Sequence, residues 1–537
     1  MSTDTPSLGT ATRRELYALA KERGLEGRSS MSRDELLAAL RDGGRGDGPS
    51  EEAGDIDRGP TPPTEHGAPK ASDDAPVGDG GRGGQQPAAS RFEAFSRLAE
   101  ARAHGELVML PRILEGNDRR LHVRQTLRED HQTRIANRHE DARAKFDALA
   151  DSLYSFFRGT CLLFYRDLAG EDAWMPTVLT LGDLHPGNFG VMPSADNVPI
   201  FGVNDFDEAY YAPFTWDLKR GAVGFMIAAG EEGGHGPKRQ RKIARRFVRG
   251  YIDGVTRYAD DPVEHELQVR MDNAPKLIRG LIKSALQDRE AWLAEDHHDE
   301  FGRGFRADDE LVPISSRREE FQGLVDRFVE ENDVDVPARA GEMRVKDVAE
   351  RKGAGTASLG LARYYVLIEG PNADGSDDLV IELKQARRSA LAGLVPPSEY
   401  TVDGRADRIA HAHGVQLVRG DVFYGHVELE GMSFMSRERA PFRDDIDLDE
   451  LSKSQWMDYA EICGTSLAHA HALSDDVGEL EHDIEPKIVA AIGSQKLFID
   501  DIIRFAGEAA DRVRRDHELF IADHELGAFA SVDVVYR

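Results

Sequence analysis

The chain has 537 residues, more than one hydrophobic core usually supports, so we expect several folded units or one large elaborated domain. Hydrophobic residues make up 40% of it, which is ample for a core. Acidic residues outnumber Lys and Arg by 97 to 68 and are spread along the whole chain, giving a formal net charge of -29. Such an acidic surface repels nucleic acid and anionic membranes, so a nucleotide binds only where glycine amides, a lysine and a divalent metal overcome this field.

Several features indicate a cytoplasmic location. The first residues, Met-Ser-Thr-Asp-Thr-Pro, contain neither the basic region nor the apolar core of a secretory signal. The longest apolar run, Gly221 to Ala229, is too short to span a bilayer. The two cysteines, Cys161 and Cys463, are too few for a disulfide framework or a four-cysteine zinc site, so we expect buried, inert thiols.

Residues 8–42 are predicted to form two short helices. Thr12 with Glu15, and Ser32 with Glu35, match the capping-box spacing at a helix start. The segment "ELYALAKERGLEGRSSMSRDELLAALR" resembles the N-terminal module of transcription termination factor Rho, which accompanies RNA binding in Rho. Its basic residues are nearly balanced by acidic ones, so a nucleic-acid contact and a protein-interaction or tethering role both stay open.

A composition break separates this module from the rest of the chain. Residues 43–90 are rich in Gly, Pro, Asp, Glu and Ser and contain no aromatic residue. Such a segment buries too little apolar area to offset the entropy lost on ordering, which predicts a disordered linker. Aromatic and branched residues return from Arg91 onward and no similar break follows, so residues 91–537 are expected to form one large unit.

The unit is predicted to have an α+β fold, with a small sheet and a large helical body. Phe146, Leu149, Leu153 and Phe156 recur at helical spacing. The other elements expected in chain order are strands at 177–181 and 198–203, a long helix from Thr215 to about Thr256, strands at 362–369 and 379–383, and amphipathic helices over 450–537.

The strongest motif is "LTLGDLHPGNFGV", in which a buried strand ends at Leu181. A tight turn enforced by the following Pro-Gly pair then presents Asp183, His185 and Asn188. A second strand ends at "VNDFDE", which adds the carboxylates of Asp205 and Asp207.

These side chains fit phosphoryl transfer if the two strands are neighbours. That reaction needs one carboxylate for the proton of the acceptor hydroxyl, and oxygen ligands that hold magnesium on the phosphates. Hard oxygen ligands suit magnesium. A resemblance to kinase-like catalytic loops implies that Asp183 is the catalytic base and that Asn188 and Asp205 are the magnesium ligands, within loops at 177–220, with His185 and Asp207 in support.

The spacing from Asp183 to Asn188 resembles the catalytic loop of aminoglycoside and choline kinase-like enzymes. The resemblance implies that Asp205 is the metal-binding Asp of the second kinase motif, and that Asp217 in "FTWDLKRGAVGF" accepts N–H bonds from the catalytic loop. Asp217 also suits a helix N-terminus, so the two interpretations stay open. The histidine that precedes the catalytic Asp in many kinases is replaced here by Leu181.

A glycine-rich segment and a strand lysine, within 345–390, form the second constellation. The segment "RKGAGTASLGLARYYVLIEG" resembles a kinase glycine-rich loop, which implies binding of ATP phosphates, although Ser358 stands where the third glycine belongs. Lys384 in "ELKQA" resembles the phosphate-binding lysine. A surface hairpin with an exposed lysine is the alternative. The expected nucleotide-binding residues are Gly353, Gly355, Ser358, Gly360 and Lys384.

For three further polar positions the sequence leaves alternative partners open. The segment "RADRIAHAHGVQLVRG" offers no glutamate for Lys384, which leaves Glu382 or Glu399 as candidates. Arg437, in the candidate hinge strand "GMSFMSRERAP", is expected to contact phosphate or an acidic partner. Arg158 of "FFRG" is expected to be structural or to face phosphate.

The order of these motifs is reversed relative to ordinary kinases, in which the glycine loop and lysine come first. A circularly permuted, two-lobed kinase-like fold would reconcile them. The helix "YAEICGTSLAHAHALS" resembles the one that runs into a kinase catalytic loop. Together the motifs are similar to the bacterial family catalogued as domain of unknown function 2252, over Arg91 to Arg537, which implies a kinase-like fold but no substrate.

We therefore expect an ATP- and magnesium-dependent phosphotransferase acting on a hydroxyl-bearing acceptor. One alternative is a metal-dependent phosphoesterase, whose further ligands would come from His411, His413, His469 and His471. Histidines in helical Ala-rich stretches are more often ordinary core or surface residues. The other alternative is a non-catalytic nucleotide-binding adaptor, which would have no need for four polar groups at one site.

Overall fold

The computed structural model describes residues 90–261, 263–299, 301–352, 360–396, 405–475 and 483–530, together with residues 37, 88 and 480. The chain divides into two compact units, 1–89 and 90–537, and the fold below is that of the second. The predicted helical module, the linker, Gly353, Gly355 and Ser358 lie outside the described residues. Within the described ranges, no helix is both long and apolar enough to cross a membrane.

Six helices open the unit and form one side of its main core. They are α3 (Arg91–Ala103), α4 (Gly116–Asp130), α5 (Gln132–Asn137), α6 (His139–Asp151), α7 (Leu153–Gly159) and α8 (Cys161–Arg166). The single helix predicted around Phe146 is broken at Ser152, whose backbone is extended and whose side chain accepts the N–H of Ser155 to start α7. The helical spacing was predicted correctly, but the N-cap at Ser152 divides the segment into two helices, α6 and α7.

Two small antiparallel sheets carry the acidic loops. Strand β1 (Thr177–Thr180) pairs with β4 (Tyr210–Pro213), and β2 (Phe189–Pro193) pairs with β3 (Pro199–Val203) and β11 (Asp444–Asp445). The strands expected to be direct neighbours, β1 and β3, therefore belong to different sheets. Their loops still meet, because β2 follows the first loop and β4 follows the second.

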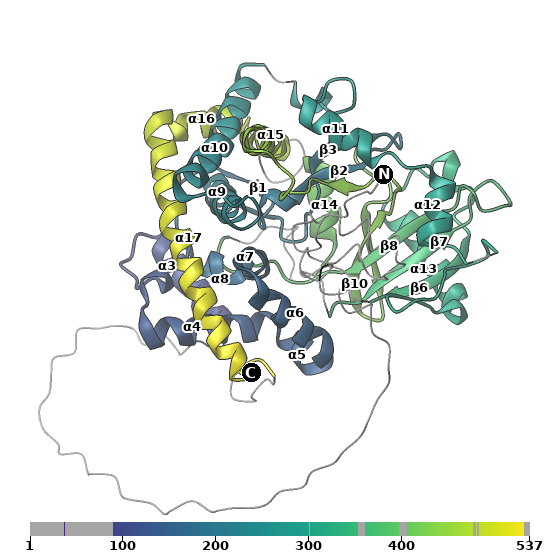
Figure 1. Ribbon diagram of the computed structural model, residues 1–537, viewed down its shortest axis with the longest axis horizontal. Helices are drawn as coiled ribbons and strands as arrows, with labels where there is room; N and C mark the ends of the chain where they lie inside the picture. The colour runs from purple at the N-terminus through teal and green to yellow at the C-terminus, as the bar shows by residue number, and fades with distance from the viewer. Residues whose placement is uncertain are drawn as a thin grey trace, which may run out of the picture. The chain divides into compact units, whose positions relative to one another are not determined.

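The long helix predicted after Thr215 is two helices, α9 (Phe214–Glu231) and α10 (Pro237–Asp260). The break contains Gly234 at φ 59° and ends at Pro237, which suits the first turn of a new helix. The C-terminal helices are α15 (Lys453–Ala472), α16 (Glu485–Ile492) and α17 (Gln495–Glu525). α10 packs along α15 and against α9, so these helices form the body seen beside the small sheets (Figure 1).

A six-stranded antiparallel sheet carries the lysine strand. Its order is β5 (Leu311–Pro313), β6 (Val345–Arg351), β7 (Arg363–Ile368), β8 (Leu379–Gln385), β10 (Met432–Glu438) and β9 (Gly425–Leu429). α13 (Arg318–Glu331) covers one face, while α11 (Lys276–Ala285), α12 (Arg289–Asp296) and α14 (Asp407–Gln416) complete the described helices of this region.

Alternation along β8 decides which side chains face the acidic loops. Leu379, Ile381 and Leu383 lie in the apolar cluster that includes residues of α13. Successive strand residues point to opposite faces, so Glu382 and Lys384 lie on the other face. The α+β prediction is thus confirmed, with helices exceeding strands and strands β7 and β8 close to their predicted bounds.

Candidate functional site

Asp217 on α9 anchors the backbone at the start of the first acidic loop, the loop that contains Asp183 and Asn188. Its carboxylate accepts the N–H groups of Leu181 at 2.7 Å and Gly182 at 3.0 Å. The side chain is fully buried, and Nε2 of His471 lies 3.2 Å from Oδ2, the oxygen that also accepts the N–H of Leu181. The backbone contact implied by the kinase resemblance is therefore present, and it aligns the strand end that presents Asp183.

Arg220 holds the Asp183 carboxylate on one side. Its Nε and Nη2 lie 2.9 Å and 2.5 Å from Oδ1 of Asp183. The guanidinium is completely buried and lies over the rings of Phe157 and Phe164. Both of these bonds go to Oδ1 of Asp183, and Oδ2 lies on the side of His185, whose Nε2 is 3.9 Å away.

Sequence reasoning missed Arg220, although a signal was present. Arg220 follows Asp217 by three residues on α9, and residues at this spacing lie on the same side of a helix. A buried helix that directs one carboxylate at the loop backbone therefore also directs this arginine at the loop. The pair of contacts fixes both the backbone and the side chain of the loop.

His185 is a buried, neutral member of the same loop. Its Nδ1 accepts the N–H of Gly187 at 3.1 Å, so the ring proton lies on Nε2, which is 3.9 Å from Oδ2 of Asp183. Burial, followed by the charges of Arg158 and Arg220, holds the pKa of His185 well below its usual value. Arg158 itself is exposed, with its guanidinium 5.7 Å from the ring of Tyr154, so both roles expected for it stay open.

The two expected magnesium ligands are brought together by the β2–β3 hairpin. Phe189 pairs with Val203, and the N–H of Asn204 then donates to the carbonyl oxygen of Asn188 at 3.2 Å. The side-chain amide of Asn188 donates to the carbonyl oxygen of Asp183. Asp205 follows directly, and its Oδ1 accepts the N–H of Asp207 at 3.1 Å.

The donor set at this position fits magnesium bound with a phosphate ligand. Burial, followed by the neighbouring Asp207 carboxylate, raises the pKa of Asp205. Over the described ranges, no group of three or more His, Cys, Asp or Glu side chains is arranged to hold a metal. Magnesium usually takes one or two protein oxygen ligands and completes its shell with phosphate oxygens and water.

Lys384 reaches the second acidic loop from the large sheet. Its ammonium pairs with Asp207, and the residue is only 6% exposed. Burial alone would raise the pKa of Asp207, but Lys384 outweighs it and holds that pKa below its usual value. The lysine strand and the acidic loops, 177 residues apart at this contact, therefore form one site.

Glu382 is not the partner of Lys384. It pairs instead with Arg363 at 3.1 Å and with Arg437 at 2.5 Å, because the register of β8 places Arg437 opposite Glu382. Of the two partners expected for Arg437, the acidic one is found. Glu399, the other candidate for Lys384, lies outside the described residues.

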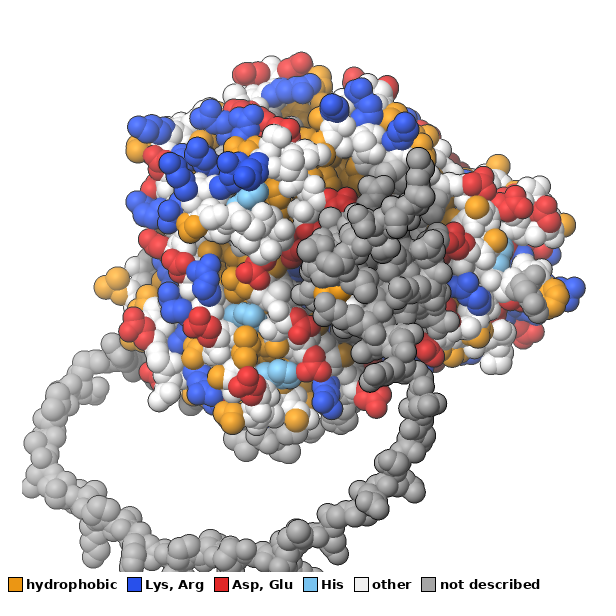
Figure 2. Space-filling view, in the orientation of Figure 1, with side chains coloured by type: hydrophobic (Ala, Val, Ile, Leu, Met, Phe, Trp, Pro, Cys, Tyr) orange, Lys and Arg blue, Asp and Glu red, His pale blue; other side chains and the backbone are white. Residues whose placement is uncertain are grey.

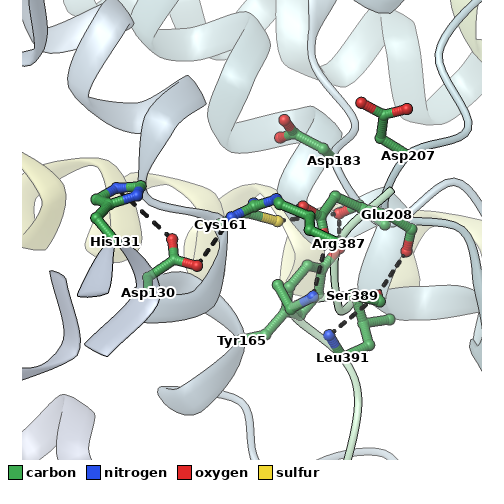
Figure 3. Close-up of polar contacts among 12 residues, drawn as sticks. Asp130, His131, Cys161, Tyr165, Asp183, Asp207, Glu208, Arg387, Ser389 and Leu391 are labelled. Carbon is green, nitrogen blue, oxygen red and sulfur yellow. Dashed lines mark hydrogen bonds and ion pairs between the residues drawn. The ribbon is translucent and has the colours of Figure 1, made fainter. Parts of the chain in front are cut away.

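Two arginines, the half-buried Arg387 and the buried Arg408, fix the backbone after Asp207 and were also missed from the sequence. Figure 3 shows Arg387 between two carboxylates, with Nη2 2.5 Å from Oε1 of Glu208 and Nη1 2.9 Å from Oδ1 of Asp130. Arg408 on α14 donates to the carbonyl oxygen of Asp207 at 2.8 Å. The helix whose sequence offers no glutamate for Lys384 thus contacts the loop through an arginine.

Residues 138–523 match the family described as "Uncharacterized protein conserved in bacteria (DUF2252)". The match covers well over half of the chain and includes all of the residues discussed above except Asp130. The chain belongs to this family. No curated protein and no solved structure matches it. The family expected from the motifs is confirmed, and the DUF2252 match itself names no activity.

The four histidines considered as metal ligands make other contacts in this DUF2252 domain. His471 lies between Asp217 and the hydroxyl of Tyr251, which is 2.9 Å from Nδ1. His469 contacts the carbonyl oxygen of Glu264 at 2.8 Å. Nε2 of His411 lies 3.0 Å from the hydroxyl of Tyr211. The ring of His413 stacks on that of Tyr424, with the ring centroids 3.8 Å apart.

Gly182 is the residue at which the two acidic loops touch. Its φ is 77°, and a Cβ there would lie 2.3 Å from the carbonyl oxygen of Glu208. We expect Gly182→Ala to lower the free energy of unfolding by about 2–3 kcal/mol, from the left-handed backbone and the overlap together. Urea unfolding of the full chain measures this.

The matched control for this substitution is Gly280→Ala. Gly280 lies within α11, and a Cβ there meets nothing within 4 Å. Alanine should stabilise that helix by about 0.5–1 kcal/mol, so the same change has the opposite sign. Equal effects at both positions would contradict the close approach of the loops.

Proposed function

We propose that this DUF2252 chain is an ATP- and magnesium-dependent phosphotransferase of the kinase-like class, acting on a hydroxyl-bearing acceptor. One observation carries the proposal: three separate segments meet at one site, the first with Asp183 and Asn188, the second with Asp205 and the third with Lys384. The links are the hydrogen bonds Asn188–Asp183, Asn204–Asn188 and Asp207–Asp205 and the Lys384–Asp207 ion pair. Phosphoryl transfer depends mainly on positioning and on neutralising charge, which is what these groups supply.

Each residue has a role that its contacts support. Asp183 orients the acceptor hydroxyl and takes its proton at Oδ2, while Arg220 holds Oδ1. Asn188 and Asp205 would hold magnesium, which neutralises phosphate charge when bound. Lys384 supplies a buried ammonium, which pairs with Asp207 in the free protein and pairs with a phosphate of ATP when the nucleotide binds.

The contacts of α15 support a circularly permuted kinase-like arrangement. Near the C-terminal end of this helix, Ser474 accepts the N–H of Leu179 in β1 at 3.2 Å. Tyr459 on α15 donates to the carbonyl oxygen of Pro186 in the candidate catalytic loop at 2.7 Å. The helix therefore leads in space into the strand that precedes the loop, although nearly three hundred residues separate them in sequence.

The proposal extends to the segments outside the described residues. The glycine-rich segment ending at Gly360 would cover the phosphates, since it joins β6 to β7 beside the lysine strand. The Rho-like module at 8–42 would recruit a partner in the cytoplasm, and the linker would tether that partner to the large unit.

Thermal unfolding of the full chain with ATP, with and without magnesium, tests the function. Ligand at a hundredfold its dissociation constant should stabilise the fold by about 2.7 kcal/mol. We expect a magnesium-dependent rise in Tm that Asp205→Asn and Lys384→Ala abolish, because each removes a group that would contact the bound phosphates or metal.

The controls are Asp253→Asn and Lys283→Ala, which remove the same charges from exposed positions on α10 and α11. Both should keep the full shift. A shift with manganese alone, and none with any nucleotide, would overturn the proposal in favour of a metal-dependent phosphoesterase.

A further inference from the structure

One helix carries a net positive charge, opposite in sign to that of the whole chain. α10 contains eight Lys or Arg residues and two Asp residues, a local excess of six positive charges in a protein of net charge -29. Figure 2 shows blue side chains gathered on the face over α10. At physiological ionic strength the Debye length is about 8 Å, so a ligand on this helix experiences mainly the local charge.

The helix is held so that its basic side chains must project outward. Ile243, Phe247, Val248 and Tyr251 are all fully buried against the body of the unit. The basic residues lie on the opposite side of the amphipathic helix, and most of them are exposed. Because the apolar face is occupied by the protein core, the helix has no apolar face with which to enter a membrane.

Most of these cations lack an acidic partner. Arg245 pairs with Asp500 at 2.6 Å, and Arg246 pairs with Glu461 at 2.7 Å. Within the part of the chain that the structure describes, the side chains of the other cations between Pro237 and Arg249 make no hydrogen bond or ion pair: Lys238, Arg239, Arg241, Lys242 and Arg249. A chain with many surplus carboxylates therefore leaves five neighbouring cations uncompensated.

Their spacing forms a rigid row. Lys238, Lys242 and Arg249 follow one side of the helix over about 16 Å, at a rise of about 1.5 Å per residue. The aromatic side chains of α10 are buried, so its exposed face offers no platform on which bases would stack. Six of its eight cations are arginines, whose planar forks bind phosphate oxygens in pairs.

We propose that the exposed face of α10 binds the phosphate backbone of nucleic acid, without reading base sequence. The row of unpaired guanidinium and ammonium groups supplies the charge, and the buried apolar face keeps the row straight. The inference does not rest on the proposed phosphotransfer. It locates a nucleic-acid contact on the large unit, where the overall acidity of the sequence predicts repulsion.

Fluorescence anisotropy with the full chain and a labelled DNA duplex of about twenty base pairs tests this surface. Affinity should fall with rising salt, and two unrelated sequences should bind alike. In the variant Lys238→Gln, Lys242→Gln, Arg249→Gln the affinity at low salt should fall about tenfold or more, and the salt slope should decrease by about three.

The matched control removes three exposed arginines from α17 instead, by Arg504→Gln, Arg514→Gln and Arg515→Gln. It should keep both affinity and slope. Asp205→Asn should also bind the duplex normally, so loss of phosphotransfer and loss of this surface give different results. Far-UV circular dichroism and Tm verify that each variant is folded.

Three outcomes overturn the inference. The first is a wild-type chain that does not bind the duplex at low salt. The second is equal loss of binding in the α10 and α17 variants, which would make the interaction a property of total charge. The third is tighter binding of a polyglutamate peptide than of the duplex at the same salt, which would assign the surface to an acidic protein partner.

Discussion

Replacing Asp217 by alanine is expected to lower the free energy of unfolding by about 3–5 kcal/mol. The carboxylate is fully buried and accepts the N–H groups of both Leu181 and Gly182. Alanine leaves these two donors without an acceptor in a region that water does not reach, and each such donor costs about 1–3 kcal/mol. Urea unfolding of the full chain, followed by circular dichroism, measures the difference.

Two further variants separate this mechanism from a general loss of charge. Asp217→Asn keeps one acceptor oxygen but turns an amide donor toward the second N–H group, so we expect a smaller loss of about 1–3 kcal/mol. Asp253→Ala removes an exposed carboxylate from α10 and should change stability by less than about 0.5 kcal/mol. Similar losses for Asp217→Ala and Asp253→Ala would mean that the loop does not depend on its anchor.

The parts of the site that the sequence predicts are those carried by local pattern. A buried strand followed by "GDLHPGN" indicates a turn, and the turn appears as a short 3-10 helix over Pro186–Asn188, between β1 and β2 and directly before β2. The apolar run in "LVIELKQ" likewise predicts the strand that bears Lys384. Both inferences need only neighbours within a few residues.

The parts that sequence reasoning missed depend on pairs brought together by the fold. Lys384 finds its carboxylate on the Asp207 loop because of how the large sheet meets the small ones, and no spacing within β8 encodes this. Glu382, two residues away, pairs instead with Arg437, because the strand register places these two residues opposite each other. The break at Ser152 was missed for another reason: a helical pattern continues across a cap that only the backbone conformation reveals.

Asp183→Asn is expected to lower the rate of ADP release from ATP, with magnesium present and water as the acceptor, by about 10²–10⁴-fold. An amide cannot take a proton from the attacking hydroxyl. The Tm shift caused by ATP and magnesium should persist, because Asn188, Asp205 and Lys384 are unchanged. A variant that releases ADP at the wild-type rate would contradict the role of Asp183 as the base.

The difficulty in this test is that Asp183 also neutralises Arg220, which is fully buried. Asp183→Asn therefore leaves an uncompensated guanidinium and is expected to lose about 3–5 kcal/mol of stability as well as turnover. The double variant Asp183→Asn, Arg220→Met removes both charges and places an apolar side chain among Phe157 and Phe164. It should recover most of the stability and none of the turnover. If turnover returned together with stability, Asp183 would serve only to fold the loop; if stability alone returned, the proton-accepting carboxylate and the structural ion pair would be two separate functions of one residue.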